Sequence, residues 1–131
     1  LLGIETPAQL ETHFLRGGLF ENYVILEFLK QRYNAGRPSN LYFWRDHVGN
    51  EVDLIIDQAG KLTPIELKSG ATLNSSLYDS LKRFANIAGN DSTPGQLIYG
   101  GDRSANRKEG PAHSWRTFKQ ANWADSLLKR P

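Results

Sequence analysis

Three charged residues, Asp53, Glu66 and Lys68, bring two carboxylates and an ammonium group into one short stretch of sequence, GNEVDLIIDQAGKLTPIELKSG. Two carboxylates held close together repel each other and lose solvation, which a fold usually tolerates when a cation lies between them. Oxygen ligands of this kind suit a hard divalent cation such as Mg²⁺. If folding brings Asp53 and Glu66 together, the residue types therefore predict a divalent-cation site with a lysine beside it.

The same stretch predicts a β-hairpin that would bring these residues together. Residues 51–57 alternate between apolar and polar side chains, and residues 62–68 return after an Ala-Gly turn. If the strands pair directly across that turn, Asp53 lies opposite Glu66, with Cβ atoms roughly 5 Å apart. Lys68 then follows one pleat along the second strand. The alternation predicts that all three side chains share one face of the sheet.

A family resemblance rests on these residues. Asp53, twelve further residues and then Glu66-Leu67-Lys68 resemble the motif of the PD-(D/E)XK nuclease superfamily, with Val52 in place of the usual proline. Glu21, in GGLFENYVILEFLK, matches the glutamate that this superfamily often carries on its first helix. The wider sequence, well matched over residues 14–88, also resembles a nuclease-like domain of unknown function found C-terminal to a P-loop module in bacterial and archaeal AAA-type predicted ATPases.

The resemblance implies a fold and a set of roles. The fold would be α/β, with a restriction-endonuclease-like αβββαβ core and a mixed sheet of four or five strands flanked by helices. Asp53, Glu66 and Glu21 would bind Mg²⁺ or Mn²⁺. Lys68 would activate the attacking water or offset charge on phosphorus. The catalytic set is then Glu21, Asp53, Glu66 and Lys68, and the reaction is hydrolysis of a phosphodiester, with DNA as the expected partner.

Composition limits the alternatives. A chain of 131 residues predicts one domain over 1–131, and 39% hydrophobic with 23% charged residues describes an ordinary globular protein. The chain has no cysteine, which excludes disulfides and thiolate chemistry and fits a reducing cytoplasm. No apolar run approaches the roughly 20 residues that span a bilayer, so we expect no membrane partner. The chain contains neither methionine nor a P-loop motif, so we expect it to be the C-terminal piece of a longer protein whose ATPase domain precedes it.

Helix and strand signals complete the predicted order. Thr6-Pro7-Ala8-Gln9 predicts a capping box that opens a short helix, and Gly17-Gly18 predicts its end. A second helix over 19–34 is apolar nearly all round, which predicts deep burial. Further elements are expected as a strand over 41–46, a helix from about 75 to 88, a strand over 96–99, a polar loop over 100–110, a strand over 114–118 and a terminal helix from Asn122.

Each functional assignment has a structural alternative. Glu51 lies opposite Lys68 in the same register, and an exposed pair of this kind is worth under about 1 kcal/mol. Glu21 could instead pair with a buried arginine, for example Arg45. Phosphate contacts are conceivable for Tyr78, Lys82 and a loop containing Arg103, Arg107 and Lys108, although solvated surface explains them as well. The rival function is a nuclease-like domain that no longer cuts and instead binds DNA, or docks or oligomerises the ATPase.

Overall fold

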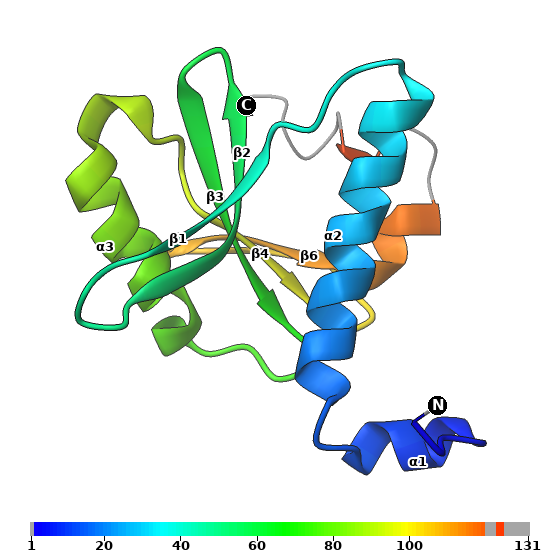
Figure 1. Ribbon diagram of the computed structural model, residues 1–131. Helices are drawn as coiled ribbons and strands as arrows, with labels where there is room; N and C mark the ends of the chain where they lie inside the picture. The colour runs from blue at the N-terminus through cyan, green and yellow to red at the C-terminus, as the bar shows by residue number, and fades with distance from the viewer. Residues whose placement is uncertain (1, 120–122, 125–131) are drawn as a thin grey trace.

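The computed structural model describes residues 2–119 and 123–124. It is a mixed α/β domain in which one sheet is flanked by helices (Figure 1). In chain order the elements are α1 (Pro7–Thr12), α2 (Arg16–Asn34), β1 (Leu41–Arg45), β2 (Glu51–Gln58), β3 (Lys61–Lys68), the 3₁₀ helix η1 (Ser75–Tyr78), α3 (Asp79–Ala88), the 3₁₀ helix η2 (Gly89–Asp91), β4 (Gln96–Tyr99), β5 (Ala105–Arg107), β6 (Gly110–Ser114) and the 3₁₀ helix η3 (Trp115–Lys119).

The sheet has six strands in the order β1-β2-β3-β4-β6-β5. Strands β1, β2 and β3 form an antiparallel meander, whereas β3, β4 and β6 run parallel to one another. A parallel neighbour requires a crossover, and α3 supplies it between β3 and β4. Strand β3 is therefore the point at which the sheet changes from antiparallel to parallel pairing.

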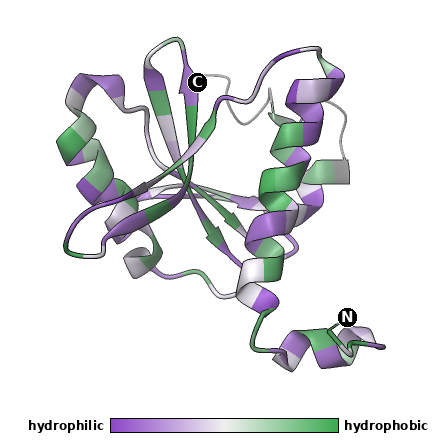
Figure 2. Ribbon diagram, in the orientation of Figure 1, coloured by the Kyte–Doolittle hydropathy of each residue, from purple (hydrophilic) through white to green (hydrophobic). Residues whose placement is uncertain are grey.

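Two apolar cores cover the two faces of the sheet. One joins α2 to the sheet through Val24, Phe28, Leu54, Ile56, Ile65, Leu67 and Ile98, together with Trp123 and Ala124. The other joins α3 to the opposite face through Val52, Ile55, Tyr78, Leu81, Phe84, Leu97, Tyr99 and Ala112. Figure 1 shows α2 and α3 on opposite sides of the strands, and Figure 2 shows hydrophobic residues along α2 and in the crossing strands.

The helices differ from expectation in three places. The capping box at Thr6 and Gln9 is confirmed, but Gly17 and Gly18 lie inside α2 and do not end a helix. The prediction that α2 is deeply buried is also wrong, because only Val24 and Phe28 of this helix are fully buried. The helix expected from residue 75 begins as the 3₁₀ turn η1 and becomes α-helical only at Asp79.

The C-terminal third contains more strand than predicted. The segment 100–110 includes β5, which gives the sheet six strands where four or five were expected. The strand predicted over 114–118 is wrong in position, because β6 ends at Ser114 and η3 follows. The helix predicted from Asn122 lies largely outside the described residues. Among the helices that the structure describes, none has the length and apolar character needed to cross a membrane.

Candidate functional site

The predicted hairpin register is confirmed. Strands β2 and β3 pair from Gln58 with Lys61 up to Leu54 with Ile65. The regular pairs end one step before Asp53 and Glu66. Beyond that point the Leu67 N–H donates to the side chain of Asp53, at 2.8 Å from Oδ2. The hairpin therefore holds the Asp53 carboxylate against β3, at the segment that carries Glu66 and Lys68.

A β-bulge lies at Asp53. On the β1 side, Tyr42 pairs with Ile55 and Trp44 pairs with Val52, so two β2 residues, Asp53 and Leu54, face the single residue between them on β1. Val52 consequently packs in the α3-side core and Leu54 in the α2-side core, although a regular strand would place both on one face. Bulges redirect side chains and are common beside active sites. The simple alternation predicted for β2 fails at the residue that matters most for the site.

Glu66 is a buried carboxylate beside Lys68. Its side chain is 7% exposed, and Lys68 Nζ lies 2.7 Å from Glu66 Oε1. The other oxygen, Oε2, is buried and has no hydrogen-bond partner among the residues that the structure describes. Burial raises the pKa of Glu66 to about 7, the Lys68 ammonium opposes that rise and the Asp53 charge adds to it. A buried acceptor without a donor is costly, and a cation or a bound water would relieve it.

The pKa values of Asp53 and Lys68 are both raised. Burial raises the pKa of Asp53, while the Leu67 N–H and the Lys68 charge act in the opposite direction. Burial alone would lower the pKa of Lys68, but Glu66, Asp53 and Glu21 outweigh it, so the pKa of Lys68 is raised and the amine stays protonated. The structural alternative for Lys68 was a cross-strand pair with Glu51, but within the described residues its ammonium pairs with Glu66 instead.

Glu21 belongs electrostatically to the same group. It is half-buried on α2, and its pKa is raised first by burial and then by the charge of Asp53, with Lys68 opposing. The amino-terminal end of α2 is tied to the end of β3, because Arg16 Nη2 donates to the Ser69 carbonyl at 2.9 Å. Within residues 2–119, Glu21 makes no ion pair with Arg45 or with another arginine. That Glu21 reaches toward the pocket of Asp53 and Lys68 stays a prediction, which these electrostatic interactions support.

The fit to a metal ion is partial. Within the described part of the chain, no three His, Cys, Asp or Glu side chains lie close enough together to hold a metal ion. The oxygens present are still the right donors, since Mg²⁺ is often bound by one or two carboxylates together with water and substrate phosphate. Asp53 and Glu66 could supply these two carboxylates, and the unpartnered Glu66 Oε2 is the atom that most needs a cation. Glu21 interacts electrostatically with Asp53 and Lys68, but within the described residues it does not complete a group of three metal ligands.

The remaining basic and aromatic candidates lie elsewhere. Tyr78 is buried and donates to the Gly110 carbonyl at 3.2 Å, so it is a core residue and neither a phosphate contact nor part of a solvated helix face. Lys82 is exposed beside Asp79, and Arg107 pairs with Glu109. His113 accepts or donates one hydrogen bond with Gln96 at 3.0 Å, and burial lowers its pKa to about 4.

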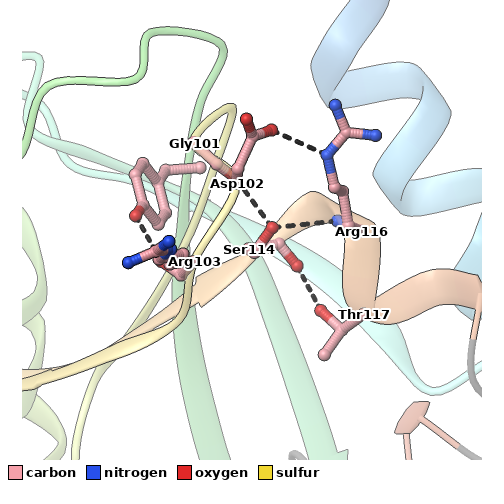
Figure 3. Close-up of polar contacts among 7 residues, drawn as sticks. Gly101, Asp102, Arg103, Ser114, Arg116 and Thr117 are labelled. Atoms are coloured by element: carbon pink, nitrogen blue, oxygen red, sulfur yellow. Dashed lines mark hydrogen bonds and ion pairs between the residues drawn. The ribbon is translucent and has the colours of Figure 1, made fainter.

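A polar network at the ends of β4 and β6 was not predicted (Figure 3). Ser114 Oγ donates to the Gly101 carbonyl at 2.7 Å and accepts from the Arg116 N–H at 3.2 Å. Arg116 Nε also donates to Asp102 at 2.6 Å, and the Arg116 guanidinium lies over the Trp115 ring. Asp102, Trp115 and Arg116 line the same cavity as Arg16 and Ser69. Because these two groups of residues are far apart in the sequence, no short motif could predict that they lie together.

The fold and the charged cluster together define a mixed α/β domain with a buried acidic site at the end of its central hairpin. Comparison with protein families places it further: a family model described as "Domain of unknown function (DUF4143)" matches residues 16–118, and the chain belongs to that family. Neither the curated proteins nor the solved structures include a significant match.

Proposed function

We propose that this domain is a metal-dependent phosphodiesterase acting on nucleic acid, with DNA as the expected substrate, on a restriction-endonuclease-like core. The observation that carries the proposal is the buried, unpartnered Glu66 Oε2 beside Asp53 and Lys68. Burial raises the pKa of three carboxyl groups that all interact electrostatically with Lys68, and perturbed groups of this kind concentrate at functional sites. A purely structural surface would have little reason to bury Glu66 with one oxygen unsatisfied.

The residues divide the work as follows. Asp53 and Glu66 would ligate Mg²⁺ or Mn²⁺, and Glu21 would hold a water of the same ion. A bound ion would polarise the scissile phosphate and make a ligated water more acidic. Lys68, which stays protonated next to Glu66, would orient the attacking water and offset the charge that builds up on phosphorus. The Leu67 N–H fixes one Asp53 oxygen, and the other oxygen would be the metal ligand.

The proposal includes an ATPase in the same polypeptide as the partner of the domain. The resemblance of the chain to domains that follow a P-loop module supports this, as does its membership of a family matched over residues 16–118. An ATPase that moves or opens DNA would present the phosphodiester to the site. The net charge of +2 is compatible with DNA as substrate. Because this charge is small, the affinity for DNA would depend mainly on specific contacts and not on the overall charge.

The test separates the roles of Lys68 and Asp53. Lys68→Ala should abolish cleavage of plasmid, branched or single-stranded DNA while Mn²⁺ binding stays largely intact, because a protonated lysine cannot ligate a cation. Asp53→Ala should lose both, because one of few anionic oxygens disappears. Nicking assays beside calorimetry of Mn²⁺ binding measure the two effects, with Lys82→Ala as a control on an exposed lysine outside the cluster. Cleavage that survives in Lys68→Ala would contradict the assignment.

One observation favours a second function, a docking or oligomerisation module for the ATPase that no longer cuts. Strand β1 is an edge strand, and its Tyr42 and Phe43 are 59% and 76% exposed. Exposed apolar side chains on a free sheet edge invite pairing with another chain. Absence of Mn²⁺ binding and of cleavage by the full polypeptide, together with loss of assembly in Phe43→Ser, would favour this function over hydrolysis.

A further inference from the structure

A cavity of about 550 Å³ lies where α1, α2 and the ends of β3, β4 and β6 meet. Its lining combines aromatic, cationic and main-chain surfaces, contributed by Tyr23, Trp115, Arg16, Arg116, Ser69 and Gly100. The volume is in the range of small-molecule sites, which are mostly apolar with a few placed polar groups. The cavity is separate from the carboxylate cluster, but one of its walls is the continuation of β3.

The wall is joined to the proposed catalytic lysine. Ser69 directly follows Lys68, so their Cα atoms are about 3.8 Å apart. The Gly100 N–H donates to the Lys68 carbonyl at 2.9 Å and thereby fixes the end of β4 against the end of β3. A Cβ on Gly100 would lie 2.1 Å from the Ser69 carbonyl oxygen, so the approach requires glycine. A ligand in the cavity is therefore held one residue from Lys68.

Two arginines border the cavity. Arg16 donates to the carbonyls of Glu11 at 3.2 Å and Ser69 at 2.9 Å, which are neutral acceptors, and within residues 2–119 it has no carboxylate partner. Among the described residues, Arg16 therefore forms no direct ion pair at the end of β3. Arg116 is paired with Asp102, but that pair is exposed, and exposed pairs contribute under about 1 kcal/mol. Arg116 can therefore exchange its partner for a phosphate.

The aromatic side supplies a stacking surface. Tyr23 is 41% exposed, and its ring is held in place by Phe118, at 5.7 Å between centroids, and by the edge of Trp115, at 6.4 Å. Because two neighbouring rings already restrain the Tyr23 side chain, little side-chain conformational entropy is lost when a planar ligand stacks on it. Bases stack on such rings without strong preference for sequence.

We propose that this cavity receives one unpaired nucleotide next to the bond to be cut, with its phosphate at Arg16 and its base stacked on Tyr23. The placement beside a scissile bond rests on the proposed function. The acidic residues Glu11 and Asp102 line the cavity together with Arg16 and Arg116, so acidic and basic residues are equal in number, which suits one base with one phosphate and not a long run of backbone. The carboxylate oxygens can accept hydrogen bonds from base amino groups. Bases in duplex DNA are stacked and paired, so the substrate class is nucleic acid with a single-stranded end or flap.

The test compares three labelled probes with the full polypeptide, with Ca²⁺ replacing Mg²⁺ to suppress cleavage: a blunt duplex, the same duplex with a single-stranded overhang, and that overhang with abasic nucleotides. The overhang with bases should bind most tightly by fluorescence anisotropy. Tyr23→Ala should weaken this binding about 5- to 150-fold, which corresponds to roughly 1–3 kcal/mol, and should leave the blunt duplex unchanged. Tyr23→Phe keeps the ring and should bind like the wild type.

The outcomes separate this proposal from the proposed function. Equal affinity for base-containing and abasic overhangs, or no effect of Tyr23→Ala, overturns the nucleotide site even if the domain cleaves DNA. A base preference that depends on Tyr23 but comes without any metal-dependent cleavage supports the nucleotide site and overturns hydrolysis. Thermal melts of both Tyr23 variants exclude misfolding, which the exposure of this residue makes a small risk. If an Arg16→Ala variant melts like the wild type, equal loss with base-containing and abasic overhangs supports its phosphate contact.

Discussion

Replacing Glu66 by glutamine should change how the free energy of unfolding depends on pH. Burial raises the pKa of Glu66 from its ordinary 4.5 to about 7 in the folded chain. An acid with a higher pKa in the folded state holds its proton more tightly there, so the wild type loses stability as the pH rises from 4.5 to about 7. At about 1.36 kcal/mol per pH unit, the loss from this one group is about 3 kcal/mol.

Glutamine has nearly the shape of a protonated glutamate and stays neutral at every pH. The stability of Glu66→Gln relative to wild type should therefore rise by about 3 kcal/mol between pH values below 4.5 and above 7. The difference between the two proteins is the quantity to follow, because His113 acts in the opposite direction. Burial lowers the pKa of His113 to about 4, so its contribution to stability grows with pH up to the ordinary 6.5, and it cancels in the difference.

Urea denaturation of both proteins with EDTA, at several pH values across this window, measures the effect. A difference that stays flat or falls with pH would refute the argument that Glu66 is buried with its charge poorly compensated. A second series with Mn²⁺ extends the test, because a cation that binds only the folded, ionised site adds stability by mass action. Mn²⁺ should stabilise the wild type above pH 7 and leave the variant nearly unchanged.

Two further predictions concern neighbouring residues. Glu21→Gln should weaken Mn²⁺ binding by about tenfold without changing the urea midpoint at neutral pH by more than a small amount, as calorimetry and denaturation would show; unchanged binding would remove Glu21 from the metal set. Gly100→Ala should destabilise the fold by about 1–3 kcal/mol, because the added carbon meets the Ser69 carbonyl at 2.1 Å; Gly70→Ala, where a Cβ meets nothing within 4 Å, is the control, and equal melting of the two would contradict the close approach.

The hairpin and the strand β4 could be read from the sequence because their signals are local. Alternation over β2, an Ala-Gly turn and a short apolar run each depend on residues close in the chain, and the resulting register placed Glu66 and Lys68 correctly on β3. Glu21 was predicted as a site residue from its place on an apolar helix and from family resemblance, and it stays a prediction. Its proximity to Asp53 depends on how α2 docks on the sheet, which the sequence alone does not determine.

The failures share a cause in tertiary packing. The bulge at Asp53 depends on pairing with β1, which forces two residues opposite one. Gly17 and Gly18 are poor helix formers, yet α2 runs through them because the helix is anchored by contacts such as the bond from Arg16 to Ser69. The strand β5 has only three residues and forms against β6, so its own sequence carries little signal.

The change from antiparallel to parallel pairing at β3 has a consequence for the order of folding. The β2–β3 hairpin closes a short loop, whereas the bond from Arg16 to Ser69 spans 53 residues and the β3–β4 pairing waits for α3. We expect Asp53, Glu66 and Lys68 to meet early, while they are still hydrated, and the burial that raises the pKa of Glu66 to come late. Glutamine removes the cost of burying a charge, so Glu66→Gln should slow unfolding in stopped-flow experiments above pH 7. The folding rate should stay nearly unchanged, since interactions formed after the transition state act on unfolding.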